Sequence, residues 1–377
     1  MKQNDNLKND SATTQIPHSE LRIQNLVVSS SPHLHDKTNV RSVMWDVVIA
    51  LSPALVAGVY FFGINALILT MYGVIAAILT EALILFLRKK PVVVNDGSAV
   101  ITGILVSFNV HAGVSWWIPV VGSVFAIAIG KHVFGGLGHN ILNPALLGRA
   151  FLMASWPTQM TSNWPITSMQ SMNGIARSTL DVTSVQITGA TPLSVAQTLR
   201  DPLFIENLGE NGSEIANDIF HNLTDFPTLV NLFWGNISGC IGEVSVFALL
   251  IGGVYLFFRK VIEWRIPFYY MLTVFVLTYI FGGLDGIFTG NLNVAMFHML
   301  SGGLMLGAIF MATDLVTSPI TKKGRRIFAI GCGVLTVVIR LIGGYPEGVS
   351  YSILIMNLCV PLIDKYTYPR PFGNEKK

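Results

Sequence analysis

The segment DGSAVITGILVSF (Asp96–Phe108) has a counterpart in SGGLMLGAIFMATD (Ser301–Asp314), and this pair decides the predicted fold. Both are apolar runs interrupted by small residues, and each is the third apolar segment of its half. The next segment of each half ends in a similar motif, VFGG at Val133–Gly136 and LIGG at Leu341–Gly344. Weak repeats with glycine-interrupted helices are typical of transporters, whose working site lies near the middle of the membrane between the repeats.

Composition places these segments in a membrane. The chain of 377 residues is 51% hydrophobic and 12% charged, whereas an average soluble domain carries about 25% charged residues. Several segments are shorter than the ~20 residues of a full span, so we expect tilted or broken helices. Ten apolar segments are predicted: residues 43–62, 66–87, 98–110, 116–134, 142–157, 242–258, 267–283, 295–312, 327–342 and 349–363.

Five segments per half make the second copy inverted relative to the first, with Asn143-Pro144 opening the last segment of one half and Asn357 inside that of the other. The predicted fold class is an all-α polytopic membrane protein with about ten transmembrane helices in two inverted five-helix repeats. A long extracytoplasmic loop joins the halves. The predicted domains are an N-terminal arm (1–36), a membrane repeat (37–157), the loop (158–241), a second repeat (242–364) and a C-terminal tail (365–377).

Lys and Arg set the predicted orientation. They gather in alternate connections, as at Arg88–Lys90 and Lys322–Arg326, while the other short loops (63–65, 111–115, 284–294, 343–348) carry neither. The positive-inside rule then puts both termini in the cytoplasm and residues 158–241 outside it. We expect a multi-pass protein of the cytoplasmic (inner) membrane, surrounded by the lipid bilayer.

Sequence motifs exclude several classes of function. The three cysteines have no CxxC spacing, the eight histidines have no HExxH or similar pattern, and no P-loop or GxSxG motif occurs. The basic residues are spread over short loops. We therefore predict no metal site, no catalytic residue and no nucleic-acid partner.

Ionisable residues inside apolar segments are candidate functional residues, because a charge in a membrane is costly. Glu81, Arg149 and Arg340 lie deep in their segments, and buried ion pairing competes there with an ion or cofactor contact. We expect a second group to cap helices or reach the interface instead: Asp46, Lys131, Asp314 and Asp364.

GGLGHNILNPALLGRA (Gly135–Ala150) is the densest polar feature on the predicted cytoplasmic side. Its glycines allow close backbone approach, and Asn140 and Asn143 supply amide donors and acceptors. Arg149 follows about one and a half helical turns after Asn143. Such a segment suits a planar, polar-edged ligand such as an isoalloxazine or quinone ring; the alternative is a helix break that binds nothing.

The second candidate stretch is ITGATPL (Ile187–Leu193), inside the long loop. Gly189 allows a tight turn, and Pro192 favours an extended conformation at Thr191. We expect the Thr191 hydroxyl on an accessible, stiffened turn.

These residues resemble the RnfD/NqrB family. Its members are subunits of the Rnf ion-translocating ferredoxin:NAD oxidoreductase complex and of the sodium-pumping NADH:quinone reductase. The resemblance covers about residues 28–373, and its ends, SSPHL and LIDKYTYPRPFG, look more like the Rnf subunits. The other stretches that carry it are Phe134–Phe151, Thr188–Leu193, Gly235–Leu256, Leu300–Pro319 and Ile339–Asp364.

The resemblance implies a covalent flavin. In the family, the last Thr of a D-x-x-[ST]-x-A-T motif carries FMN through a phosphoester bond made by a flavin transferase outside the cytoplasm. By position that residue is Thr191, and Thr188, Gly189 and Ala190 complete the cofactor-binding motif. The motif's acid is replaced by Val185, with Asp181 the nearest acid upstream.

The resemblance also implies that the chain is an electron-transfer protein working with the A, B, C, E and G subunits of an Rnf-type complex, without catalysing a reaction alone. A second, non-covalent flavin, riboflavin in the family, is expected in the bundle at Gly135–Asn143 and Arg149, with Gly343–Glu347 as their inverted counterpart. The coupling ion, Na⁺ or H⁺, is open. The alternatives are a quinone-reductase subunit of the NqrB type, a flavin-free transporter or channel, and a purely structural scaffold.

Overall fold

The computed structural model describes residues 39–92, 94–161, 164, 191–207, 209, 211–284, 290–343 and 348–368. The chain divides into two units, residues 1–39 and 40–377, and every described helix belongs to the second. Within the described ranges the fold is helical, with a single isolated bridge between His111 and Cys240 in place of any strand.

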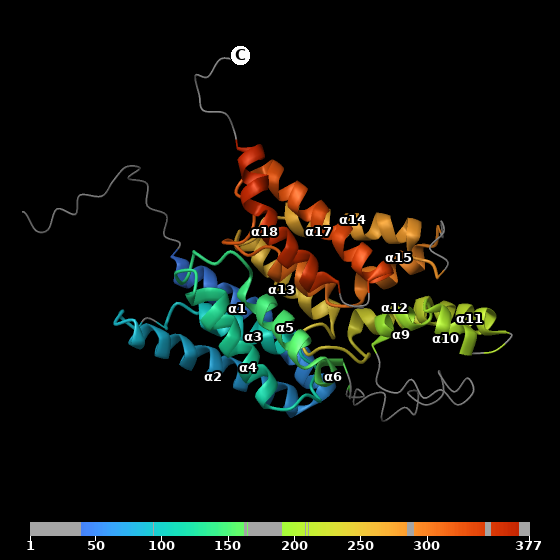
Figure 1. Ribbon diagram of the computed structural model, residues 1–377, viewed down its shortest axis with the longest axis horizontal. Coiled ribbons are helices and arrows are strands. Elements are labelled where there is room, and N and C mark those ends of the chain that lie inside the picture. Colours follow the sequence, from blue (N-terminus) through green and yellow to red (C-terminus); the bar gives the residue numbers. More distant parts are fainter. Residues whose placement is uncertain are drawn as a thin grey trace, which may run out of the picture. The chain divides into compact units, whose positions relative to one another are not determined.

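The first half contains five helical segments (Figure 1). A turn at Gly63, whose φ of 78° is left-handed, separates the two longest of them. Asn143 caps the last, because its side-chain oxygen accepts from the N–H groups of Ala145 and Leu146, and Pro144 follows at the first helical position. The segments are α1 (Val40–Phe62), α2 (Ile64–Leu87), α3 (Ser98–Phe108), α4 (Trp117–Phe125) continuing into the π-helix η1 (Ala126–His132), and α5 (Pro144–Ser155).

The second half repeats this number of segments. They are α13 (Val246–Phe258), α14 (Arg265–Phe281), the bent unit α15 (Leu292–Leu300) with α16 (Leu304–Leu306) and η2 (Gly307–Met311), then α17 (Lys322–Ile342) and α18 (Val349–Thr367). The described residues between the halves form shorter helices: α6 (Pro157–Thr161), α9 (Pro192–Thr198), α10 (Pro202–Asn207), α11 (Gly212–Thr224) and α12 (Phe226–Trp234).

Each of the ten predicted apolar segments coincides with one of these helical segments, with ends shifted by a few residues. Fewer of these helices are long and apolar enough to cross a membrane. By length and composition alone, two described helices, α1 and α2, suffice, and the bent pair Leu292–Leu300 with Leu304–Met311 is a third candidate. The helical class of the prediction is thus confirmed, and the number of spans stays a prediction.

The bend of 65° in the α15–α16 unit exposes backbone carbonyls inside the bundle. Gly302 and Gly303 turn the chain with left-handed φ values of 66° and 67°. Arg340 of α17, which is 2% exposed, donates to the carbonyls of Ser301 (2.9 Å) and Gly302 (3.0 Å) and to that of His298. Arg340 therefore supplies the hydrogen bonds that the broken helix lacks, as irregular backbone in an apolar bundle requires.

The two halves meet through small residues. α1 packs against α13, and at Gly252 of α13 an added Cβ would lie 2.0 Å from the carbonyl oxygen of Ala50. Such close approach is typical of helix contacts inside membranes, where small residues let backbones touch. Further along the same pair of helices, Asp46 of α1 accepts hydrogen bonds from Tyr255 of α13 (2.9 Å) and from Arg259 at its end (2.9 Å).

We predict that Gly252→Ala destabilises the protein by about 1–3 kcal/mol, because the new methyl forces α1 away from α13. The thermal midpoint of unfolding in detergent should fall by several degrees. Gly239→Ala is the matched control, since an added Cβ there meets nothing within 4 Å. An unchanged midpoint for Gly252→Ala would contradict the close packing.

Candidate functional site

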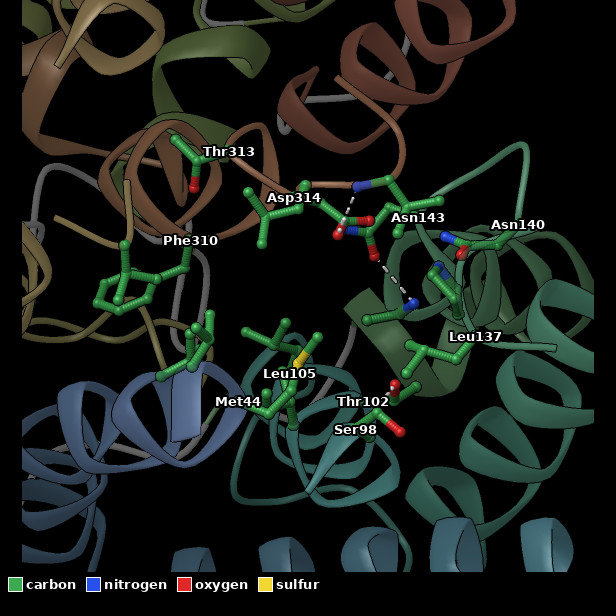
Figure 2. Close-up of a pocket in the computed structure, with 18 of the residues that line it drawn as sticks. Met44, Ser98, Thr102, Leu105, Leu137, Asn140, Asn143, Phe310, Thr313 and Asp314 are labelled. Carbon is green, nitrogen blue, oxygen red and sulfur yellow. Dashed lines mark hydrogen bonds between the residues drawn. The ribbon is translucent and has the colours of Figure 1, made fainter. Parts of the chain in front are cut away.

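A cavity of about 110 Å³ lies where α1, α3, the start of α5 and η2 meet. Figure 2 shows Asn140, Asn143 and Asp314 on one side of it, facing Ser98 and Thr102 on the other. The apolar wall includes Met44, Leu105, Leu137 and Phe310. We call this the asparagine cavity. It combines amide, hydroxyl and carboxyl groups at its edge with an apolar interior.

Asn143 ties the two halves together beside this cavity. Its side-chain N–H donates to the carbonyl of Met311 in η2 (3.2 Å). Its backbone N–H donates to the side-chain oxygen of Asn357 (3.2 Å), in the amide orientation that also lets Asn357 donate to the carbonyl of Thr317 (3.1 Å). The two asparagines singled out from the sequence, one in each half, thus contact each other directly.

A buried charge pair borders the asparagine cavity. Lys131, which lines the cavity, donates to Glu81 (2.6 Å) and to Ser98 (2.6 Å). Lys131 and Glu81 are each 3% exposed. The expectation that Lys131 reaches the membrane interface was wrong, because the carboxylate of Glu81 on α2 holds its ammonium inside the bundle.

Arg149 lines a different cavity, of about 180 Å³, together with Thr191. Both halves and the segment between them line it, with Met153 of α5, Met160 of α6, Trp164 and Ser350 of α18. Among the described residues of its lining, Arg149 is the one with a positive charge. We call it the threonine cavity. α5 connects the two cavities, since Ala145 lines the first and Arg149, about 6 Å further along the helix, lines the second.

Asn109, which lines the threonine cavity, and Glu243, which does not, fix the Arg149 guanidinium. It donates to the side-chain oxygen of Asn109 at the end of α3 (2.6 Å) and lies 3.4 Å from the carboxylate of Glu243 before α13. The Arg149 and Glu243 side chains are each 7% exposed. A buried pair of this kind is held by its added hydrogen bonds, and removing either partner leaves an uncompensated charge.

Thr191 caps the N-terminus of α9. Its Oγ1 accepts from the N–H of Ser194 (3.2 Å) and donates to the Ser194 hydroxyl (3.1 Å). The predicted extended conformation is confirmed, with ψ of 150°. The predicted accessibility is wrong: Thr191 is 7% exposed, because α9 packs its apolar face, Leu193, Val195, Ala196 and Leu199, into the core.

Two side chains anchor α9 to the second half. The amide of Gln197 donates to the carbonyl of Gly343, the C-cap of α17 (2.7 Å). The guanidinium of Arg200 donates to the carbonyls of Gly282 (2.6 Å) and Gly283 (3.2 Å) at the end of α14. Burial lowers the pKa of Arg200 to about 10, which leaves it protonated at neutral pH. These bonds hold Thr191 in place relative to the bundle.

The predicted cofactor residues therefore separate into two places. Asn140 and Asn143 line the asparagine cavity, while Arg149 joins Thr191 at the threonine cavity. Thr188, Gly189 and Ala190 lie outside the described residues, as do Val185 and the counterpart segment after Gly343. Sequence reasoning missed Asn109, Gln197 and Arg200. Only their polarity beside apolar runs could have drawn attention to them.

We predict that Gln197→Ala loosens α9. Loss of the bond to Gly343 removes about 1 kcal/mol, so amide hydrogen exchange in residues 193–199 should accelerate roughly fivefold. Thr198→Ala is the control, because among the described residues that hydroxyl bonds within α9, to the carbonyl of Ser194. Equal exchange in both variants would show that Gln197 does not anchor the helix.

Comparison with known proteins gives a consistent result. The profile of the NQR2, RnfD, RnfE family matches residues 27–373. The chain is similar to the D subunit of the Na⁺-translocating ferredoxin:NAD⁺ oxidoreductase complex of Acetobacterium woodii, with 47% identity over 93% of this chain and 96% of the relative. It is 45% identical to the proton-translocating counterpart of Clostridium ljungdahlii, over 93% and 96%. It is 38% identical to the D subunit of the ion-translocating oxidoreductase complex of Stutzerimonas stutzeri, over 90% and 94%.

Proposed function

The chain belongs to the NQR2, RnfD, RnfE family as a subunit of an ion-translocating ferredoxin:NAD oxidoreductase complex, and we propose that it carries electrons through FMN bound covalently to Thr191. The observation that carries this proposal is that the Thr191 hydroxyl and the Arg149 guanidinium share one enclosed cavity between the halves. When bound, the flavin supplies the redox chemistry, and the protein supplies position and electrostatics.

The chemistry of the threonine cavity fits such a group. Met153, Met160 and Trp164 offer an apolar surface for a flat ring, and Asn109 and Arg149 offer a polar edge. A volume of about 180 Å³ is below the ~300–1,000 Å³ of typical ligand pockets. We expect the two methionines, whose side chains are flexible, to move aside.

The burial of Thr191 indicates that flavin attachment precedes the docking of α9. A flavin transferase has to reach Oγ1, which is enclosed once α9 has docked. We infer that the transferase acts on a state in which α9 is still detached, and that Gln197 and Arg200 then fasten the modified segment.

The second flavin, riboflavin in this proposal, occupies the asparagine cavity. Asn140 and Asn143 provide amide groups for the polar edge of a ring, and Ser98 and Thr102 provide hydroxyls opposite (Figure 2). Arg149, which the sequence grouped with these asparagines, serves the covalent flavin instead. α5 is then the element that positions both groups.

The proposed architecture is ten transmembrane segments in two inverted repeats, with both termini cytoplasmic and the Thr191 segment outside. The neighbours of each helix support the repeat: α2 packs on α3 and α4 as α14 packs on α15 and α17. The first and last segments of the halves also pair with their equivalents, α1 with α13 and α5 with α18. Partners are the A, B, C, E and G subunits. Na⁺ or H⁺ is the translocated ion.

Thr191→Ala should abolish covalent attachment of the flavin, because the hydroxyl that forms the phosphoester bond is gone. The measurement is intact mass, with in-gel flavin fluorescence, after co-expression with the transferase. Ser194→Ala is the control and should keep the flavin, since Thr191 still presents its hydroxyl. A chain that folds without added FMN mass in the wild type would support a flavin-free transporter or channel.

Arg149→Met should lower the midpoint potential of the covalent flavin. A cation in the cavity favours the reduced, more negative form, and its loss is worth on the order of 1–2 kcal/mol in a partly screened site. For a two-electron couple this corresponds to tens of millivolts, about 20–45 mV. Glu243→Gln should shift the potential in the opposite direction, and Arg149→Lys should shift it less. Potentials that are equal in all three variants would place the ring elsewhere.

Two assays separate the remaining alternatives. Electron donation by reduced ferredoxin rather than NADH distinguishes the Rnf-type complex from a quinone reductase of the NqrB type. Electron transfer that survives Thr191→Ala in the assembled complex would make this subunit a scaffold.

A further inference from the structure

A third cavity, of about 570 Å³, opens between the end of α13, the link into α14 and the first turn of α17. We call it the basic cleft. Its charged lining consists of Lys260, Lys322, Arg325 and Glu263. It shares Val261, Ile262, Thr313 and Leu315 with the asparagine cavity but none of the residues of the threonine cavity.

The charge of the basic cleft is poorly compensated by the protein. Glu263 pairs with Arg265 and Arg325. Within the described ranges neither Lys260 nor Lys322 forms an ion pair, and both are exposed. The positive charge is therefore available to a ligand.

The helix terminus adds to this imbalance. The first five residues of α17 include Lys322, Lys323, Arg325 and Arg326 and no acidic residue. Cations at a helix N-terminus oppose the helix dipole, which favours anions there. An anion in the cleft would interact favourably with the helix dipole and would reduce the repulsion among the lysines and arginines.

The apolar part of the lining says which kind of anion fits. Phe257 is 37% exposed, Leu315 59% and Ile320 76%. A small hydrophilic anion would leave these side chains in water, whereas an amphiphile covers them and gains the free energy of apolar burial. The complementary ligand has a negative head and apolar chains.

We propose that the basic cleft binds an anionic phospholipid, with its phosphate between Lys260 and Lys322 and its acyl chains along Leu315 and Ile320. The placement of this cleft at the cytoplasmic leaflet rests on the membrane topology of the proposed function. Basic pockets between membrane helices on that side recognise anionic headgroups.

The test titrates the purified chain in detergent with phosphatidylglycerol, or with phosphatidylcholine of the same acyl chains, by native mass spectrometry. Each lysine near a membrane surface contributes ~1 kcal/mol to binding an anionic lipid. The wild type should therefore prefer phosphatidylglycerol by roughly tenfold or more, and the double variant Lys260→Gln/Lys322→Gln should reduce this preference to below about twofold.

The matched control is Lys323→Gln/Arg326→Gln, which removes the same amount of charge from the start of α17, at residues outside the cleft lining. It should keep the preference. Equal losses in both double variants, no preference in the wild type, or full displacement of the lipid by millimolar inorganic phosphate would each overturn the proposal. The same spectra report the FMN mass on Thr191, so a failure of the lipid site is distinguishable from a failure of the flavin assignment.

Discussion

Broken helices inside an apolar bundle set the constraint on which the rest of this structure depends. Where α15 bends into α16, carbonyl groups lose their helical partners, and Arg340 donates to three of them. At the opening of α5, Asn143 caps the helix and bonds across to Met311. In an apolar environment an unsatisfied backbone group costs several kcal/mol. Arg340 therefore ties α17 to the α15–α16 bend within the second half, and Asn143 ties the two halves together.

Hydrogen bonds from side chains to carbonyl groups at helix ends also position the candidate site. Gln197 and Arg200 reach carbonyls at the ends of α17 and α14, and in doing so they hold the helix that Thr191 caps. The threonine cavity then forms between α5, α9 and α18, with Arg149 fixed by Asn109 and Glu243. Structural bonds and the proposed cofactor contacts are thus made by neighbouring residues on the same short elements.

Charge is distributed differently at the three cavities. Beside the asparagine cavity, Lys131 and Glu81 neutralise each other. At the threonine cavity, Arg149 is balanced by Glu243 but still faces the space next to Thr191. In the basic cleft, Lys260 and Lys322 have no acidic partner among the described residues. The second arrangement suits a group that gains negative charge on reduction, and the third a permanent anion.

The sequence by itself determined the helical segments, because apolar runs and helix caps such as Asn143-Pro144 act locally. It also indicated the family and singled out Thr191, because the motif is contiguous. Only the tertiary structure decided that Arg149 belongs with Thr191 rather than with Asn140 and Asn143, that Lys131 is buried, and that Thr191 is enclosed. Each of these depends on partners far away in the chain, such as Glu243 for Arg149 and Glu81 for Lys131. Local patterns do not encode which distant side chains will meet.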